Sequence, residues 1–186
     1  RADGPLNLAR VYFKEGRLND AVAALQRAND TNRFNPPGNR WTIAWLNGLV
    51  NKQNGYLDKA ISEFTSILED RYPEVEARQL NFSKDYEVIN ELGQTLFERA
   101  KMERGNDARQ REFLQAAAKR FYDTLAIDSE NVTAHYNVSL SHTQLGNNDK
   151  AAEHCCLYER YWPDDNARAK GTIVRRSLVS IKFWPT

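Results

Sequence analysis

The side chains best suited to bind a metal or to act as a nucleophile gather in the last third of the chain. They are all three histidines, His135, His142 and His154, and both cysteines, Cys155 and Cys156. On one helix His135 and His142 would lie about 10.5 Å apart, too far to share a zinc ion whose ligands sit about 2 Å away. His142 and Cys155 are expected to face each other across a helix pair, which leaves a two-ligand metal or redox site open. Because two ligands hold zinc poorly, we expect core residues here instead.

No other pattern in the chain points to catalysis. The sequence contains no haem-attachment Cys-x-x-Cys-His, phosphate loop, zinc-protease helix or nucleophile elbow. Acidic pairs such as Glu87 and Glu91 have the spacing of a solvated helix face rather than of an acid/base dyad. His154 and Cys155 fail as a nucleophile pair, since a core helix would bury the thiol. We therefore expect a protein that is not an enzyme and that uses no cofactor and no metal.

Charge and composition exclude further classes of function. Lys and Arg number 26 and Asp and Glu 25, giving a net charge of +1, whereas nucleic-acid binders normally show a basic surplus. No stretch approaches the roughly 20 apolar residues that span a bilayer, so we expect no membrane insertion. The adjacent cysteines are poorly placed for a disulfide, which leaves cytoplasm and bacterial periplasm equally open. The chain begins at Arg1 rather than Met, which suggests a processed or excised piece of a longer protein.

The elements that must position these side chains form an internal repeat. Apolar residues three and four apart on both sides of Gly16 predict two helices joined by a glycine turn. The same spacing of a small residue, a turn glycine, an alanine and a fourth residue recurs along the chain, as Ala9, Gly16, Ala21 and Leu25, as Gly48, Gly55, Ala60 and Phe64, and as Ser139, Gly146, Ala151 and Cys155. A further partial copy pairs residues 86–97 with residues 113–127, and Ala117 precedes Ala151 by 34 positions.

These residues resemble the tetratricopeptide repeat (TPR) family. The first copy carries the pattern of the family in full, at Leu8, Ala9, Tyr12, Gly16, Ala21, Leu25 and Ala28. The resemblance covers roughly residues 5–165 and implies an all-α fold, a right-handed superhelix of antiparallel helix pairs. It also implies a single repeat domain over residues 1–186, with repeats near 2–34, 41–73, 86–131 and 132–165 and a capping helix and extended tail at 166–186.

The expected helices follow from this pattern and its departures. We predict helices near 6–15, 19–30, 41–53, 57–69, 86–104, 108–127, 132–145, 149–160 and 166–177. Residues 35–39 and 71–85 are expected to be a loop and an irregular connector. In the third copy the turn glycine is displaced to Gly105, so both of its helices should be long. The tail aromatics Phe183 and Trp184 should pack, either on the body of the protein or on a partner.

The resemblance also implies where a partner binds, because the first helix of each pair lines the concave side of such arrays. Aromatic anchors beside Asn and Gln side chains suit peptide recognition. The expected partner-binding residues are Arg10, Phe13, Trp45, Leu49, Asn90, Gln94, Tyr136 and Asn137. For Trp45 and Tyr136 the groove is favoured over a core position between adjacent repeats, whereas Leu46 is expected in the core.

The functional expectation is a protein–protein interaction scaffold that holds a peptide or protein in the concave groove. The alternative is a structural or self-associating segment of a larger bacterial protein, which keeps a homo-oligomer open. One TPR subclass binds the C-terminal carboxylate of chaperones through cations on successive first helices. Because Glu87 and Glu91 stand at two such places here, we expect no clamp of that kind.

Overall fold

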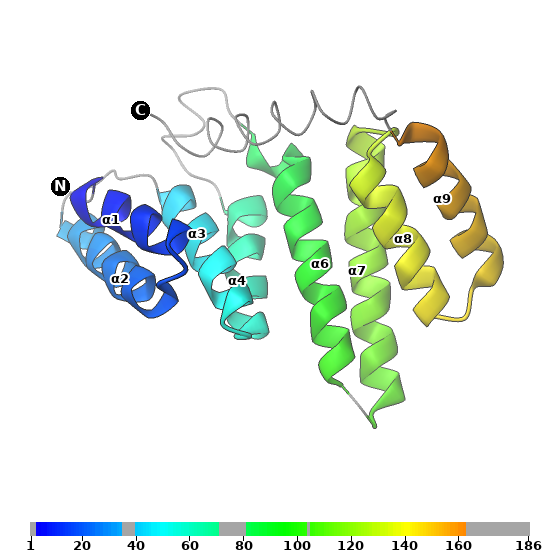
Figure 1. Ribbon diagram of the computed structural model, residues 1–186, viewed down its shortest axis with the longest axis horizontal. Helices are drawn as coiled ribbons and strands as arrows, with labels where there is room; N and C mark the ends of the chain where they lie inside the picture. The colour runs from blue at the N-terminus through cyan, green and yellow to red at the C-terminus, as the bar shows by residue number, and fades with distance from the viewer. Residues whose placement is uncertain (1–2, 35–39, 71–80, 104, 163–186) are drawn as a thin grey trace.

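The computed structural model describes residues 3–34, 40–70, 81–103 and 105–162, and within them the chain is entirely helical (Figure 1). The helices are α1 (Asp3–Lys14), α2 (Leu18–Phe34), α3 (Arg40–Gln53), α4 (Leu57–Glu69), the short 3₁₀ helix η1 (Phe82–Lys84), α6 (Tyr86–Met102), α7 (Asp107–Ile127), α8 (Val132–Gln144) and α9 (Asn148–Tyr161). They pack as four pairs, α1–α2, α3–α4, α6–α7 and α8–α9. This confirms the predicted all-α helical repeat fold.

Each pair turns at a glycine with positive φ, a conformation that costs other residues energy. The values are 73° at Gly16, 77° at Gly55, 86° at Gly105 and 78° at Gly146. At Gly16 the glycine N–H donates to the carbonyl of Phe13 at 3.1 Å, and the next N–H donates to Tyr12 at 2.8 Å. The same two bonds recur after Gly55 and Gly146, and such bonds satisfy the carbonyls left over at a helix end. The repeated glycine therefore encodes a repeated reversal of the chain.

The predicted helix positions are confirmed, with shifts at the ends. Helix α4 has the predicted bounds, and α6 and α7 are long, at 17 and 21 residues, as the displaced Gly105 suggested. Helix α1 begins three residues earlier than predicted, and α2 continues four residues further. The predicted loop at 35–39, most of the connector at 71–85, the helix at 166–177 and the tail with Phe183 and Trp184 lie outside the described residues.

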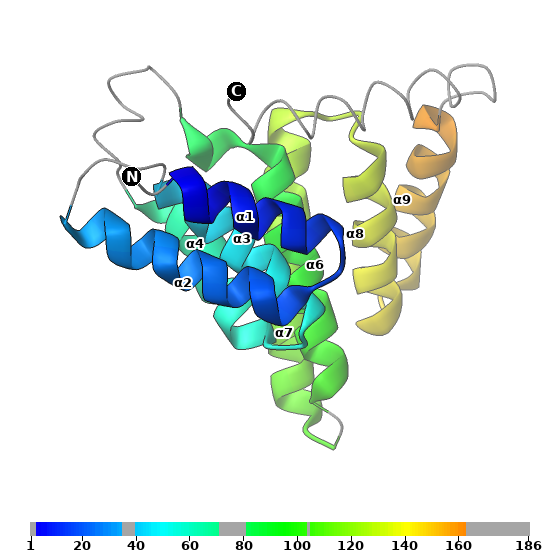
Figure 2. The ribbon, with the colours of Figure 1, turned by 60° about the vertical axis from the view of Figure 1, so that its left-hand side comes forward.

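Successive pairs stack so that each second helix packs on the next first helix: α2 on α3, α4 on α6 and α7 on α8. The pairs also rotate along the array. In Figure 2, α1 and α2 run across the view, whereas α8 and α9 run nearly upright. One hydrophobic core joins α1, α2 and α3, and a second runs from α3 to α8. None of the described helices is long and apolar enough to cross a membrane.

Two glycines inside first helices receive phenylalanine rings from the second helix of the same pair. The ring of Phe64 lies where a Cβ of Gly48 would be, and the ring of Phe121 would lie 2.6 Å from a Cβ on Gly93. Both rings are fully buried. These sockets let the paired helices approach closely, which explains the small residue at this place in each copy of the repeat.

Candidate functional site

A pocket of about 400 Å³ opens on the face formed by the first helices, between α3, α6 and the turn that leads into α8. Its wall takes Trp45 from α3, five residues from α6, and the remainder from the α7–α8 turn and the first turn of α8. Those lining residues are Tyr86, Glu87, Asn90, Glu91, Gln94, Asp128, Glu130, Asn131, Val132 and Thr133. Three successive helix pairs therefore contribute to one concavity.

The α6 wall is a stripe at helical spacing. Glu87, Asn90, Glu91 and Gln94 follow one another at intervals of three, one and three residues, which places them on one face of the helix. Asp85 fixes the start of α6, because its carboxylate accepts a hydrogen bond from the backbone N–H of Glu87 at 3.0 Å. The rotation of α6 is set by its buried apolar face, which includes Val88, Leu92 and Leu96, and this leaves the polar stripe in the pocket wall.

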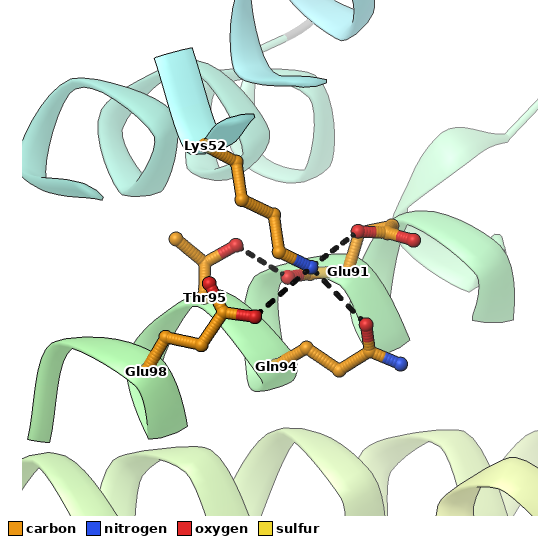
Figure 3. Close-up of polar contacts among 5 residues, drawn as sticks. All are labelled: Lys52, Glu91, Gln94, Thr95 and Glu98. Carbon is orange, nitrogen blue, oxygen red and sulfur yellow. Dashed lines mark hydrogen bonds and ion pairs between the residues drawn. The ribbon is translucent and has the colours of Figure 1, made fainter. Parts of the chain in front are cut away.

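The pocket is acidic, and one lysine at its edge offsets part of the charge. Lys52 of α3 reaches across to α6, where its Nζ lies 2.9 Å from Glu91, 3.1 Å from the Gln94 side-chain oxygen and 3.9 Å from Glu98 (Figure 3). The Lys52 side chain is only 15 % exposed, so water screens these contacts weakly. Among the described residues that line the pocket, none is Lys or Arg.

Asn90 carries an unsatisfied acceptor in the pocket wall. Asn90 is 7 % exposed, and its Nδ2 donates to Asn131 Oδ1 at 3.4 Å. Its own Oδ1 is buried with no hydrogen-bond partner among the described residues. Leaving a buried acceptor unpaired costs about 1–3 kcal/mol. Asn90 therefore lines the pocket while its Oδ1 stays buried behind the surface.

The α7–α8 turn holds the opposite wall rigidly. The Asp128 carboxylate accepts from the backbone N–H of Glu130 at 3.2 Å and from Asn131 Nδ2 at 3.0 Å. Asn131 in turn caps α8, accepting from the N–H of Ala134 at 3.0 Å. These bonds fix the Asp128 carboxylate and place Glu130, which is exposed, at the edge of the pocket.

The pocket brings together three of the eight predicted partner-binding residues, Trp45, Asn90 and Gln94. Trp45 also belongs to the core: it is 6 % exposed, and its ring centroid lies 5.5 Å from that of Phe64. Leu49 packs on the same core. Glu87 and Glu91, predicted on a solvated face, are half-buried in the pocket wall.

The other four predicted residues lie away from the pocket. Arg10 and Phe13 lie on α1, where Arg10 Nη1 donates to Asn7 at 2.9 Å and Phe13 packs on the first core. Tyr136 is 47 % exposed and packs against Tyr158 of α9, with ring centroids 5.2 Å apart. Asn137 is half-exposed on α8. A partner that touches all eight would have to run along much of the array.

Sequence reasoning missed the wall formed by Asp128, Glu130 and Asn131. Those residues were treated as the end of a repeat, although Asn131 precedes an apolar helix as an N-cap does, and so marks where the next first helix begins. A helix start in a repeat array borders the neighbouring first helix. The N-cap pattern at Asn131 was therefore the sequence signal that could have placed the α7–α8 turn beside α6.

The histidines form a buried hydrogen-bonded chain at the joint between α7, α8 and α9. His135 Nε2 lies 3.0 Å from the Ser129 carbonyl, and the Nδ1 atoms of His135 and His154 lie 2.9 Å apart. The Tyr122 hydroxyl lies 3.4 Å from His154 Nε2 and 2.9 Å from His142 Nε2. All three histidines are buried, which confirms the core position predicted for His142.

Burial lowers the pKa of both His142 and His154, because a charged ring would lose its hydration there. Lys150 adds to the lowering at His142, and His135 does so at His154. Across the described residues, no three His, Cys, Asp or Glu side chains are grouped so that they could hold a metal ion.

The prediction of a core Cys155 is wrong, since both Cys155 and Cys156 are exposed. In the second pair, Gly48 leaves a socket that the ring of Phe64 fills. In the last pair, Ser139 stands at the socket position, and its hydroxyl donates to the carbonyl of Ala151 at 2.9 Å. His154 is buried in this pair, whereas Cys155 is exposed.

Comparisons with known proteins agree with the helical repeat. Models of the family described as tetratricopeptide repeat match residues 102–166 and residues 6–35. A crystal structure of MamA superimposes with a TM-score of 0.63 at 16% identity, covering 91% of this chain and 81% of that one. A second MamA structure gives 0.63 at 18% identity, with 87% and 76% covered.

A third similar structure is TTC0263, a thermophilic TPR protein of Thermus thermophilus. It superimposes with a TM-score of 0.59 at 16% identity, covering 85% of this chain and 73% of that one. At such identities the similarity shows a common fold. No curated protein sequence matches the chain.

Proposed function

Because this chain is a tetratricopeptide repeat protein, we propose that it is an interaction scaffold that binds a polypeptide along the face of its first helices. The pocket between α3, α6 and α8 is the centre of the proposed binding surface. The observation that carries this proposal is that three successive pairs build one polar concavity around Asn90, whose buried acceptor lacks a partner among the described residues. Sites that recognise extended peptides combine apolar walls with a few fixed polar groups in this way.

Site-specific photocrosslinking tests this proposal. A photoreactive amino acid replaces Thr133 in the pocket in one variant and Lys119, exposed on α7 away from the pocket, in a control. In lysate, the Thr133 variant should crosslink to a polypeptide that mass spectrometry then maps to this face, and the Lys119 variant should not. Equal crosslinking at both positions, or none at Thr133, would show that the first-helix face is not the binding surface.

A second candidate function is self-association. It is supported by α9, which packs chiefly on α8 among the described helices and exposes Cys155 and Cys156. A second copy could cover that face. Sedimentation velocity over a wide concentration range tests this, because a dimer through α9 shifts the sedimentation coefficient with concentration and a monomer does not.

A further inference from the structure

We propose that the last helix pair, α8–α9, is under the control of protons. Protonation of its buried histidines releases the pair from α7 and removes one wall of the pocket, while α1 to α7 keep their fold. The consequence for binding rests on the proposed function, whereas the release itself depends on no partner.

The histidine network consists of the buried rings of His135, His142 and His154 and the hydroxyl of the partly exposed Tyr122. It joins three helices, because Tyr122 is on α7, His135 and His142 are on α8, and His154 is on α9. These helices stand side by side at one end of the array (Figure 1). A change in the bonds of the network therefore acts on the packing of the last pair against α7.

Apolar packing adds little to hold this pair. The buried apolar residues that α8 contributes to the second core are Ala134 and Val138, whereas α6 contributes Val88, Leu92 and Leu96. Less apolar surface means a weaker hydrophobic contribution. A polar change therefore has a larger effect on this joint than it would have at α6.

The network has little room for added protons. With neutral rings, His135 Nε2 donates to the Ser129 carbonyl, so His135 Nδ1 accepts from His154 Nδ1, 2.9 Å away. One proton can be absorbed if the hydrogens shift along the network and Asn147, next to His142, turns its side-chain amide over. With two charged rings the network holds one hydrogen more than it has acceptors, so a donor is left unpaired within it.

Charge acts in the same direction as the hydrogen bonds. Burial lowers the pKa of His142 and His154, because a charged ring would lose its hydration. Lys150 of α9 lowers both pKa values further, whereas Glu153 opposes this at His154. His135 also lowers the pKa of His154, so the network repels itself when charged. In the released pair the rings regain water and a pKa near about 6.5, so acid favours release.

The network is bonded directly to one wall of the pocket. Ser129, whose carbonyl accepts from His135 at 3.0 Å, lies between Asp128 and Glu130 in the α7–α8 turn. Both of these acidic residues line the pocket, and residues 131–133 complete this wall. On α9, Tyr161 stacks on His135, with ring centroids 5.5 Å apart. Release of the pair therefore frees the wall, and a bound polypeptide would lose its contacts there.

Hydrogen exchange of the full chain, read by mass spectrometry, tests the release without a partner. Rates at about pH 7.5 and about pH 5.5 are corrected for the chemical exchange rate, and α1 to α4 are the internal reference. At the lower pH, the α7–α8 turn, α8 and α9 should lose protection about tenfold for each extra proton that the released form binds. Helices α1 to α4 should keep theirs. A uniform loss, or unchanged protection of α8 and α9, would overturn the proposal.

Two exposed charges on α9 should move the transition in opposite directions. Lys150→Gln removes a charge that disfavours protonated rings, so α8 and α9 should lose protection at about twofold higher proton concentration. Glu153→Gln removes a charge that favours a protonated His154, so the loss should come at about twofold lower proton concentration. Lys59→Gln, exposed on α4, is the control and should leave the transition in place. Shifts of the same sign in the two α9 variants would contradict the network.

The crosslink at Thr133 reads out the effect on binding. With the captured polypeptide in pure form, the yield should fall between about pH 7.5 and about pH 5.5. The pH of this fall should move with Lys150→Gln, which separates release of the pair from titration of the partner. A yield that stays constant while α8 and α9 lose protection would overturn the link to the pocket. The absence of any crosslinked polypeptide near neutral pH contradicts the scaffold instead and leaves the proton-controlled release standing.

Discussion

At the scale of single residues, a network of hydrogen bonds joins the last two helix pairs. When the three histidine rings are neutral, only one arrangement of protons satisfies every bond in this network. The Ser129 carbonyl only accepts, so His135 Nε2 donates to it, and His135 Nδ1 must then accept from His154 Nδ1. His154 Nε2 accepts from the Tyr122 hydroxyl, whose oxygen accepts from His142 Nε2. Asn147 Nδ2, 3.3 Å away, then donates to His142 Nδ1. We assign these tautomers from the network.

The buried histidine network predicts that acid destabilises the protein. The pKa values of His142 and His154 are lowered in the folded state, so below the usual value of about 6.5 the unfolded chain binds more protons than the folded one. The free energy of unfolding should fall as the pH drops through this window, by about 1.4 kcal/mol per pH unit for each extra proton bound by the unfolded chain. Urea melts between about pH 8 and about pH 5.5 measure this slope.

The control is the double variant His142→Gln, His154→Gln, which should lose most of the slope. Glu63, whose pKa burial raises, contributes a slope of the opposite sign, but it is present in both proteins, so the difference between their slopes reports the histidines. If the free energy of unfolding of the wild type did not change over this pH window, the lowered pKa values of His142 and His154 would be contradicted.

The exposed thiols give a second residue-scale prediction. Because Cys155 and Cys156 are both exposed on α9, both should react with a small aromatic disulfide reagent in the folded protein at close to the rate seen in urea. The Cys155→Ser and Cys156→Ser variants should each react at one thiol only and melt as the wild type does. A thiol that reacts only after unfolding would restore the core position for Cys155.

At the scale of elements, the helix pairs depend on the glycine sockets. Gly93→Ala places a methyl group against the ring of Phe121, which is fully buried and cannot move away. Overpacking of this kind costs about 1–3 kcal/mol. Gly4→Ala, in α1 with nothing within 4 Å of the new Cβ, is the matched control and should be neutral or stabilising, because alanine favours helix. Urea melts compare the two, and equal effects would show that the socket is not rigid.

The elements were also what sequence reasoning predicted best. The turn glycines and the spacing of Ala60 and Phe64 were enough to find the helices, because one local conformation and one buried face repeat. The pocket was predicted only in part. Asn90 and Gln94 follow from helical spacing, whereas Asp128 and Glu130 reach the pocket through the stacking of one pair on the next, which no local pattern reports. Cys155 was misplaced because the serine at position 139 was read as equivalent to glycine.

At the scale of the whole molecule, packing runs between neighbours, so damage should stay local. Helices α1 and α2 contact α3, and α9 contacts α8, with no substantial packing between the two ends in the described part of the chain. In such arrays, stability is close to a sum over repeats and their joints. Tyr122→Phe removes the hydroxyl shared by His142 and His154 and should raise hydrogen exchange in α8 and α9 while α1 and α2 stay unchanged. Mass spectrometry reads this out, and a uniform rise over all helices would show one cooperative unit.

The long third pair, α6 and α7, extends past its neighbours in Figure 1, and Gly105 lies between these two helices. Met102 at the end of α6 is 63 % exposed. Exposed turn tips accept foreign sequence best, since few backbone contacts are lost there. The turn is thus a site that should tolerate an insertion. A reporter or an affinity peptide inserted after Gly105 should leave the melting temperature nearly unchanged and lie away from the first-helix face. Protein immobilised through a peptide at this turn would present the pocket to a partner in solution in one fixed orientation.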